Sequence, residues 1–375
     1  MKKKIIEVSS DTNIGGAGKC LLTLLENFDY ERFEVKVVLP KNSLLKPHID
    51  KMNIPVTEVD GIADKSLDFG AVSELKRIFR EEKPDLVHTH ASMSARIAAK
   101  QAGAKIVYTR HSVFPPSKKI SRGLGKKING FVNNSLADGI IAVAEAAKEN
   151  LTDTGISADK ITVILNGVDG LTPASPEEKD AIRKRFGVKD GEKVVSIVAR
   201  LEDIKGHEYF IEAADEILKS GIQARFFIAG TGSYESVLKE KVKQLKLEKS
   251  VIFTGFISDV DKLMNITDVQ ANASYGTEAT SLALLEGMSL GIPAVVSDFG
   301  GNPGVIKDGV NGFVVPKQNS AELAEGIKRL LTDDALYKRL SDGSENVFKK
   351  TFTAEAMTRN TENLYIRIID DKERG

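Results

Sequence analysis

The sequence predicts an α/β protein with two Rossmann-like domains, each built on a doubly wound parallel sheet. Short β-branched runs alternate with helical patterns along nearly the whole chain, which is typical of βαβ units. The same scheme starts again in the second half. A chain of 375 residues is also long enough for two domains of ordinary size.

Five apolar runs in the first half are expected to form strands. They lie at residues 5–8, 35–39, 86–88, 106–108 and 140–143. Between them, apolar stripes at residues 21–28 and 75–79 have helical spacing. The order of strands and helices therefore favours a parallel sheet covered on both faces.

The second half repeats this scheme with five further expected strands. They lie at residues 194–198, 226–229, 251–253, 269–271 and 294–296. A segment with two prolines at residues 170–180 separates the halves and reads as a linker that runs into a helix. We therefore expect domains over residues 1–170 and 171–350, followed by a C-terminal helix over 351–375.

The composition favours a globular cytoplasmic protein. Lys plus Arg (53) balance Asp plus Glu (53), so a protein that binds nucleic acid through its overall charge is not expected. Cys20 is the single cysteine, which excludes an intramolecular disulfide and suits a reducing compartment. Neither a secretion signal nor a membrane-spanning segment is expected from the apolar pattern.

Glycines follow two of the expected strands. Gly15 and Gly16 precede a helix, and Gly230 stands between another strand and its helix. Such loops let the backbone approach a phosphate at a helix N-terminus. A tight turn without a ligand is an equally good interpretation, because the full GxGxxG spacing is absent.

Two cations stand on the loop after the first strand of the second half. Arg200 and Lys205 are five residues apart, so both can turn toward a diphosphate. The alternative is a loop whose charges are solvated.

A pair of glutamates marks the most informative segment. Thr280 or Ser281 can cap a helix, with Glu278 at its mouth and Glu286 two turns inside. Helical rise separates the two glutamates by roughly 12 Å, about the span from ribose to sugar in a nucleotide diphosphate sugar. Glu286 then suits a ribose diol and Glu278 a hexose hydroxyl. The alternative is a pair of cap and surface residues.

Taken together, these motifs resemble the family 4 retaining glycosyltransferases (glycosyl transferases group 1) of GT-B architecture, over essentially the whole chain. The family's Glu-x7-Glu signature is matched by Glu278 and Glu286, and its diphosphate clamp by Arg200 and Lys205. His111 stands where the family usually has a histidine near the transferred sugar. Further matching segments are Gly15-Gly16, Asn166 to Asp169, Gly291 to Pro293, and Gly300 to Pro303. Ala279 and Gly304 depart from the family pattern.

The resemblance implies a hexosyltransferase of polysaccharide biosynthesis that acts with retention and without a metal or other cofactor. It implies a nucleotide diphosphate sugar, UDP-linked, as the sugar donor, and a glycan, lipid-linked sugar or small molecule as the acceptor. The first domain would bind the acceptor and the second the sugar donor, facing across a cleft, with the C-terminal helix packed back on the first domain. The implied catalytic residues are His111, Arg200, Lys205 and Glu278. The implied sugar-donor-binding residues are Gly15, Gly16, Arg200, Lys205, Gly230, Glu278, Thr280, Ser281 and Glu286.

Other functions stay open at this point. A nucleotide-sugar isomerase or epimerase of the same architecture, or a non-catalytic protein that binds sugar nucleotides, would share these motifs. A metal site at His88, His90 and His111 is disfavoured because no acidic or cysteine ligand has a suitable spacing. Asp259 and Asp261 are interpreted as helix-capping residues instead of metal ligands.

One segment of the first domain is strongly basic. Residues 86–137 contain nine cations and no Asp or Glu. At helical spacing, residues 118–131 place apolar and basic side chains on different faces, so this segment could lie on an anionic membrane. An ordinary packing helix and a cleft wall for an anionic acceptor are the alternatives. The cations are Arg96, Lys100, Lys105, Arg110, Lys118, Lys119, Arg122, Lys126 and Lys127.

Overall fold

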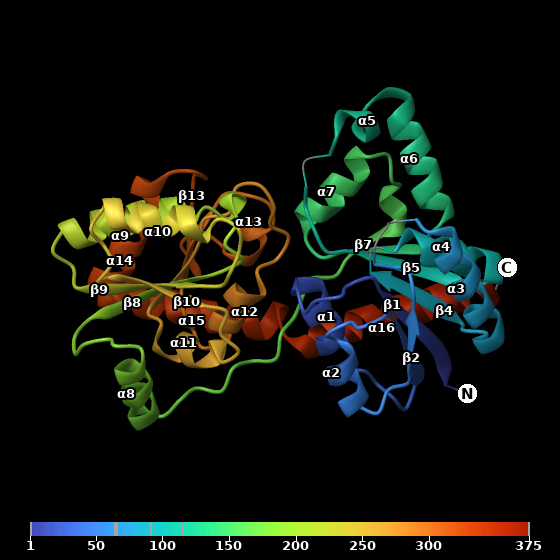
Figure 1. Ribbon diagram of the computed structural model, residues 1–375, viewed down its shortest axis with the longest axis horizontal. Coiled ribbons are helices and arrows are strands. Elements are labelled where there is room, and N and C mark those ends of the chain that lie inside the picture. Colours follow the sequence, from blue (N-terminus) through green and yellow to red (C-terminus); the bar gives the residue numbers. More distant parts are fainter. Residues whose placement is uncertain (1, 64–66, 91, 115, 374–375) are drawn as a thin grey trace. The chain divides into compact units, whose positions relative to one another are not determined.

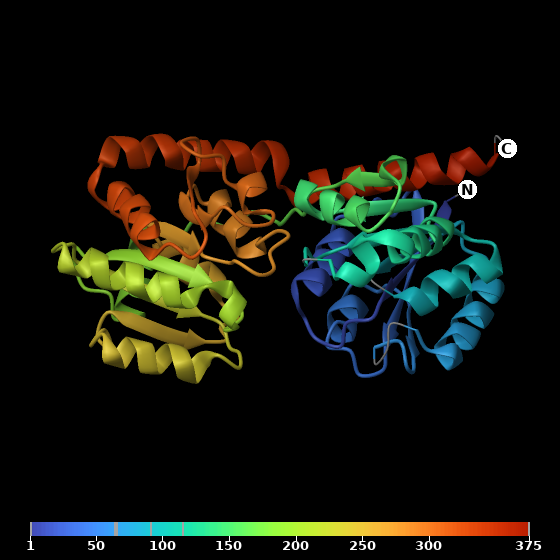
Figure 2. The same cartoon turned by 90° about the horizontal axis from the view of Figure 1, so that it is seen from above.

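The chain folds into two compact units, seen here in a computed structural model. The structure describes residues 2–63, 67–90, 92–114 and 116–373. The first unit comprises Met1–Gly167 and Ala354–Gly375, and the second comprises Val168–Thr353. Each unit has one parallel sheet with helices on its faces (Figures 1 and 2). The α/β class with two Rossmann-like domains is therefore confirmed.

The sheet of the first unit has seven strands in the order β3-β2-β1-β4-β5-β6-β7. All of its strand pairings among the described residues are parallel. The strands are β1 (Lys3–Ser9), β2 (Phe33–Pro40), β3 (Val56–Val59), β4 (Leu86–His90), β5 (Lys105–Arg110), β6 (Gly139–Ala142) and β7 (Ile161–Val163). The two edge strands, β3 and β7, were not predicted from the sequence.

Helices cover both faces of this sheet, and adjacent residues of a central strand enter different cores. Ile5 of β1 packs with Leu21 and Leu364, whereas Ile6 packs with Leu75 and Ala98. Both faces of the strand are apolar for this reason, and its sequence shows a continuous apolar run. The helices of the first unit are α1 (Gly16–Glu26), α2 (Lys46–Lys51), α3 (Phe69–Glu82), α4 (Met93–Ala102), α5 (Lys118–Ser121), α6 (Gly123–Ser135), α7 (Glu145–Asp153) and α16 (Ala354–Glu373).

Helix α16 is the last helix of the chain but belongs to the first unit (Figure 1). Its side chains Leu364, Tyr365 and Ile369 are buried in the core that also contains Ile5 of β1. The backbone N–H of Asp29 donates to Glu362 Oε1 at 2.7 Å, which joins α16 to the loop after α1. Some 190 residues separate this helix from the rest of its unit along the chain.

The basic segment forms two helices where the sequence analysis considered one. Arg122 has an extended backbone (φ −137°, ψ 152°) and separates α5 from α6. A Cβ atom at Gly125 would lie 1.8 Å from the Lys119 carbonyl oxygen, and one at Gly130 would lie 2.1 Å from the Gly155 carbonyl oxygen. These glycines, which by propensity weaken a helix, are therefore required for close backbone packing.

The second unit has a six-stranded parallel sheet in the order β10-β9-β8-β11-β12-β13. Val195 of β8 packs in one core with Phe210, while Val194 packs in the opposite core with Leu263. The strands are β8 (Lys193–Val198), β9 (Ala224–Ala229), β10 (Val251–Gly255), β11 (Val269–Asn272), β12 (Ala294–Ser297) and β13 (Gly312–Val315). The helices are α8 (Pro176–Arg185), α9 (His207–Lys219), α10 (Glu235–Gln244), α11 (Val260–Ile266), α12 (Leu282–Ser289), α13 (Asn302–Val305), α14 (Ser320–Thr332) and α15 (Asp334–Thr351).

Strand order reverses once in each sheet, between β1 and β4 in the first and between β8 and β11 in the second. In open parallel sheets, ligands bind outside the carboxyl ends of the strands at such a point. Among the described helices, none combines the length and hydropathy of a membrane-spanning segment.

Candidate functional site

Lys205 and Glu278 meet at the point of strand reversal in the second unit. Lys205 follows β8 in the short 3₁₀ turn Asp203–Lys205, and Glu278 follows β11. The Lys205 ammonium donates to Glu278 Oε2 at 3.0 Å and to the Thr277 carbonyl at 3.0 Å. Both side chains are largely buried, at 13% and 8% exposure. The structure therefore joins two predicted site residues in a direct ion pair.

Further polar groups hold the Glu278 carboxylate in place. Asn272 Nδ2 donates to Glu278 Oε2 at 3.2 Å, and Ser274 Oγ donates to the same oxygen at 3.0 Å. All three residues are buried. A buried carboxylate needs such partners, and their number fixes its orientation. The interpretation of Glu278 as a surface residue is therefore wrong.

Arg200 is placed differently from Lys205 on the same loop. Its side chain is 71% exposed, and its guanidinium contacts Glu202 Oε1 at 2.8 Å. An exposed ion pair of this kind is weak, so the guanidinium can exchange Glu202 for another anion at little cost. Arg200 is therefore an exposed cation on the same loop as the largely buried Lys205.

Glycines let the loops at the strand ends pack against one another. Gly230 has φ +141°, and a Cβ there would lie 2.1 Å from the Ala199 carbonyl oxygen. Gly300 has φ +59°, and its Cβ would lie 2.1 Å from the Glu278 carbonyl oxygen. Gly230 is thus required for packing within the unit, in line with the turn interpretation.

Helix α12 begins directly after the Glu278 loop. Ser281 is its N-cap, and the Ser281 hydroxyl accepts from the backbone N–H of Leu284 at 3.4 Å. Thr280 precedes the cap, and Glu286 lies half-buried inside the helix. The order of Glu278, cap and Glu286 expected from the sequence is present.

Asp259 does not cap a helix with its side chain, although it occupies the N-cap position of α11. Its carboxylate accepts from Arg185 Nη1 at 2.7 Å. This hydrogen bond is the main cause that lowers the pKa of the Asp259 carboxyl. The capping interpretation of Asp259 is wrong, and the residue holds α8 to α11 instead.

In the first unit, Gly15 and Gly16 form an open loop at the start of α1. A Cβ atom at either position would have no neighbour within 4 Å, and neither residue has a positive φ. No protein contact among the described residues therefore requires glycine here. Their absent side chains keep the N-terminus of α1 accessible to a ligand.

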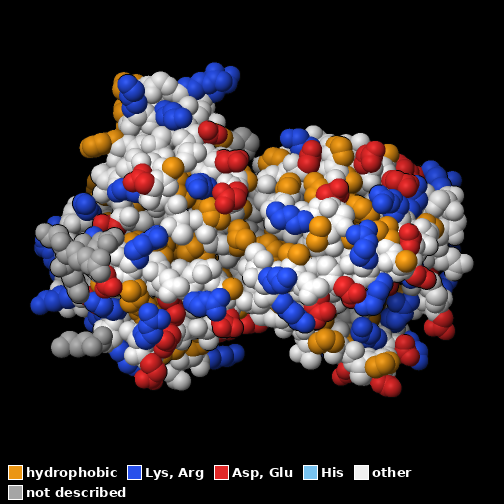
Figure 3. Space-filling view, turned by 180° about the vertical axis from the view of Figure 1, so that it is seen from behind, with side chains coloured by type: hydrophobic (Ala, Val, Ile, Leu, Met, Phe, Trp, Pro, Cys, Tyr) orange, Lys and Arg blue, Asp and Glu red, His pale blue; other side chains and the backbone are white. Residues whose placement is uncertain are grey.

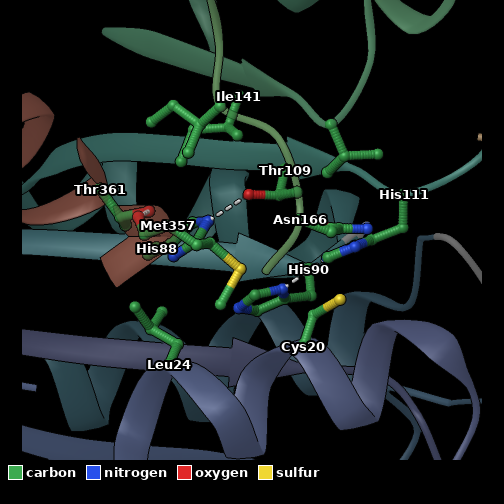
Figure 4. Close-up of a pocket in the computed structure, with 12 residues that line it drawn as sticks. Cys20, Leu24, His88, His90, Thr109, His111, Ile141, Asn166, Met357 and Thr361 are labelled. Carbon is green, nitrogen blue, oxygen red and sulfur yellow. Dashed lines mark hydrogen bonds between the residues drawn. The ribbon is translucent and has the colours of Figure 1, made fainter. Parts of the chain in front are cut away.

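His111 follows β5 and belongs to a cluster of buried polar side chains (Figure 4). Its Nε2 lies 2.8 Å from Nδ1 of His90, and His90 Nε2 lies 3.1 Å from Glu7 Oε2. His88 Nδ1 lies 2.9 Å from the same Glu7 oxygen. The Tyr365 hydroxyl of α16 donates to Glu7 Oε1 at 2.8 Å.

The surroundings favour an ionised Glu7 and the neutral forms of His88 and His111. Burial opposes ionisation of Glu7, but the attraction and hydrogen bond of His88 and the hydrogen bond of His90 outweigh it and lower the pKa of Glu7 to about 2. Burial lowers the pKa of His88. Burial, with His90 and His88 nearby, holds the pKa of His111 well below its usual value.

Glu7, His88 and His90 also meet the distance requirement of a metal site. One ligand atom from each lies within 4.8 Å of the others, and all three residues are buried. The expectation that no acidic ligand accompanies these histidines is therefore wrong. However, each of the three side chains already has a hydrogen-bond partner within the protein, and these bonds account for the arrangement.

Glu7 and Tyr365 are the members of this cluster that the sequence analysis missed. Glu7 lies on β1 opposite His88 of β4, although 81 residues separate them. The sequence signal that could have identified Glu7 is a glutamate inside the apolar run at residues 5–8. A charge buried in a central strand requires partners. The resemblance implied that the C-terminal helix packs back on the first domain, but no pattern along the chain places Tyr365 beside Glu7.

Known proteins share both units. The family model described as Glycosyltransferase Family 4 matches residues 14–170, and the model described as Glycosyl transferases group 1 matches residues 178–347. The UDP-Gal:alpha-D-GlcNAc-diphosphoundecaprenol alpha-1,3-galactosyltransferase of Escherichia coli is 27% identical over 384 aligned positions. That alignment covers 99% of this chain and 98% of the relative.

Two further relatives extend this similarity. The alpha-monoglucosyldiacylglycerol synthase of Acholeplasma laidlawii is 27% identical over 95% of this chain and 94% of its own. The crystal structure of Anabaena HepE in complex with UDP has a TM-score of 0.84 at 24% identity, covering 97% of this chain and 99% of that one. At this identity, the structural likeness establishes the shared fold.

Proposed function

The chain belongs to the glycosyltransferases of family 4 and group 1, and from this premise we propose that it transfers a hexosyl group, with retention, from a UDP-linked sugar. The proposed acceptor is a glycan, a lipid-linked sugar or a small molecule. The observation that carries the proposal is the buried Lys205–Glu278 pair at the point of strand reversal. The Escherichia coli relative, whose name specifies UDP-Gal and a diphosphoundecaprenol-linked acceptor, supports it.

Lys205 and Arg200 are proposed to stabilise the leaving nucleoside diphosphate. Negative charge grows on the diphosphate as the glycosidic bond breaks, so a preplaced cation stabilises the transition state more than the bound sugar donor. An ammonium has three N–H donors, and two of those on Lys205 point to Glu278 and Thr277. The third suits a phosphate oxygen, and the exposed Arg200 can close over the same group.

The two glutamates are proposed to hold the ends of the sugar nucleotide. Carboxylates only accept hydrogen bonds, so Glu278 suits a hexose hydroxyl and Glu286 the ribose diol. Thr280, Ser281 and the N-terminus of α12 lie between them in the sequence, where backbone N–H groups attract the diphosphate. In the first unit, His111 and the open loop at Gly15 and Gly16 are the groups that we propose to meet the substrates.

A panel of sugar nucleotides, tested with and without candidate acceptors, examines the proposal. Nucleotide release and the fate of the sugar are measured with the full chain, and NMR determines the anomeric configuration of the product. Release that depends on an acceptor, with retained configuration, is the expected result. An isomerised sugar nucleotide would instead identify an isomerase, and binding without turnover would identify a non-catalytic protein.

We also propose that turnover requires no metal ion, because Lys205 and Arg200 supply the charge that a cation would otherwise bring to the diphosphate. Dialysis against EDTA is expected to leave the rate unchanged within about twofold, as judged by nucleotide release. Loss of activity that added Mg²⁺ or Mn²⁺ restores would contradict this proposal.

The α5–α6 surface is proposed to contact an anionic membrane. Leu124, Ile128 and Phe131 are 71%, 55% and 76% exposed, so this apolar face does not pack against the described protein, as an ordinary packing helix would. Lys118, Lys119, Arg122 and Lys127 are exposed on the same pair of helices. Figure 3 shows hydrophobic and basic side chains side by side at this projecting end of the first unit. Apolar anchors with flanking cations are typical of helices that lie on anionic lipid.

A further inference from the structure

The imidazole of His111 has one partnered and one unpartnered nitrogen. Its Nε2 lies 2.8 Å from His90 Nδ1. Its Nδ1 is buried and has no hydrogen-bond partner within the described protein. His111 also lines the small cavity with His90, Asn166 and Cys20 (Figure 4). The unpartnered nitrogen therefore belongs to a side chain at the wall of a pocket.

Hydrogen bonding determines where the protons of this chain of groups lie. The Glu7 carboxylate accepts only, so the His90 nitrogen beside it, Nε2, must carry the proton. In the neutral form of His90, Nδ1 then has a lone pair. That lone pair accepts from His111, so His111 must carry its proton on Nε2. The second nitrogen of His111, Nδ1, is left as a hydrogen-bond acceptor.

The rest of the cluster reinforces this order. Glu7 accepts the Tyr365 hydroxyl on Oε1 and the His90 N–H on Oε2. His88 Nδ1 lies 2.6 Å from the Tyr365 oxygen and 2.9 Å from Glu7 Oε2. The Thr109 hydroxyl in turn donates to His88 Nε2 at 2.7 Å. The ionised Glu7 carboxylate has no proton to donate, and these neighbours fix its orientation. The direction of the His90–His111 hydrogen bond is thereby set from Glu7, which contacts the pocket residue His90.

We propose that Glu7 is a positioning residue that acts through His90 to hold His111 as the Nε2–H tautomer, so that Nδ1 of His111 accepts a hydrogen bond from a substrate hydroxyl. The inference rests on the proposed function, because it takes the hydroxyl to be one of the sugar donor or the acceptor. A buried acceptor without a donor is unfavourable, and a substrate hydroxyl removes that cost when it binds. The Nε2–H tautomer excludes an anionic group at this point, since Nδ1 has no proton to donate.

The first test measures the tautomer directly in the unmodified chain. The protein is labelled with ¹⁵N-histidine, and its five histidines give resolvable imidazole spectra in which the His111→Asn variant identifies His111. At neutral pH without substrate, His111 is expected to show a protonated Nε2 and an unprotonated Nδ1. A proton on Nδ1 of His111 in the wild type would overturn the proposal without any need for a Glu7 variant.

The second test replaces Glu7. Glu7→Gln supplies an amide that can donate to His90, so the direction of the chain is no longer set, and a mixture of His111 tautomers is expected. We expect kcat/KM to fall at least tenfold, as when other carboxylates that orient a histidine are replaced by amides. Glu7→Asp keeps an acceptor-only group and is expected to recover the wild-type tautomer and part of the activity.

Tyr365→Phe is the matched control. It removes the contacts of the Tyr365 hydroxyl with Glu7 and His88 but leaves the Glu7–His90–His111 chain intact. The wild-type tautomer and a kcat/KM within about threefold of wild type are expected. If Tyr365→Phe and Glu7→Gln lower activity equally with an unchanged His111 tautomer, Glu7 has only a structural role.

Substrate analogues that lack single hydroxyl groups test whether the His111 tautomer serves to bind a substrate hydroxyl. One such analogue is expected to lose at least tenfold in kcat/KM with the wild type and much less with Glu7→Gln. Equal losses with both proteins for every analogue would contradict hydroxyl recognition by His111. If no sugar nucleotide is turned over at all, the proposed function fails, while the NMR result still decides on the tautomer.

Discussion

At the scale of single residues, charged side chains are buried where partners from distant parts of the sequence meet them. Glu7 is paired with His88 across 81 residues, and Lys205 with Glu278 across 73. The sequence predicted Lys205 and Glu278 as site residues because each follows a strand. Their mutual pairing was not predictable, since it depends on β8 and β11 being neighbours in the sheet.

Replacement of Lys205 tests the proposed diphosphate clamp. Lys205→Ala is expected to lower kcat by roughly a hundredfold or more, because one preplaced electrostatic group is typically worth about 3 kcal/mol in the transition state. The measurement is nucleotide release in the presence of sugar donor and acceptor. Lys219→Ala removes a lysine whose side chain is 72% exposed in the same unit and serves as the control.

Thermal unfolding separates an effect on catalysis from an effect on folding. Loss of Lys205 leaves the Glu278 carboxylate with Asn272 and Ser274, so a folded protein with a lowered melting temperature is expected. Wild-type turnover and wild-type affinity for the sugar donor in the folded variant would disprove the site assignment.

His207 provides a prediction on pH-dependent stability. It is 1% exposed, and neither ring nitrogen finds a hydrogen-bond partner in the described protein. Burial, together with the nearby Lys205, lowers the pKa of His207 from 6.5 to about 4. The unfolded chain therefore binds the proton more readily. The contribution of neutral His207 to the free energy of unfolding is complete above pH 6.5 and is lost as the pH falls from 6.5 toward 4.

Denaturant unfolding at a series of pH values measures this effect. Over that range the free energy of unfolding is expected to fall by about 3 kcal/mol through His207 alone, with His88 and His111 acting in the same direction. His207→Leu should flatten the pH dependence by that amount, whereas His48→Gln, at an exposed histidine, should not. If the free energy of unfolding of His207→Leu depended on pH as steeply as that of the wild type, another group would be responsible for the dependence.

At the scale of elements, prediction succeeded for the central strands and for the edge strand β10 but missed the other three edge strands. The missed strands β3, β7 and β13 are short and lie at sheet edges, where only one side forms ladder hydrogen bonds. Central strands are buried on both faces and need long apolar runs, whereas an edge strand of three or four residues does not. The division between α5 and α6 was also missed, because close backbone contacts at Gly125 and Gly130 decide it.

At this scale, we predict that the exposed apolar side chains of the α5–α6 surface contribute to membrane binding. The double variant Leu124→Gln with Phe131→Gln is expected to reduce flotation with anionic liposomes at low salt by roughly fivefold, because it removes the two most exposed apolar anchors. High salt should weaken wild-type binding further, since the cations are screened. Leu44→Gln with Phe69→Gln removes two similarly exposed side chains elsewhere in the same unit and should have no effect. An equal loss in both double variants would argue against a specific surface.

At the scale of the whole molecule, the chain leaves the first unit at Gly167 and returns to it at Ala354. Helix α16 completes the core of that unit and supplies Tyr365 to the Glu7 cluster. The second unit, from Val168 to Thr353, is continuous in sequence. The first unit therefore contains the C-terminal helix in its core, whereas the second unit does not include it.

Deletion of residues 354–375 tests this dependence. It removes five large buried apolar side chains, each worth about 1.5–3 kcal/mol, and so costs on the order of 10 kcal/mol, comparable to the stability of a whole domain. The first unit is expected to unfold, as measured by loss of one calorimetric transition and by rapid proteolysis of residues 1–167. The side chains are Met357, Leu364, Tyr365, Ile368 and Ile369.

A fragment of residues 168–353 is the complementary control and is expected to fold by itself. Survival of a cooperatively folded first unit without α16 would contradict the importance of this helix.

The amino-acid sequence by itself determined the α/β class, the two-domain organisation, the central strands and most of the proposed site. It could do so because strand periodicity, loop glycines and charged loop residues are local features. The tertiary structure alone decided the Lys205–Glu278 pair, the chain from Glu7 through His90 to His111, and the contact of Tyr365 with Glu7. These contacts follow from which strands are neighbours in a sheet, and strand order is set by the packing of the whole unit.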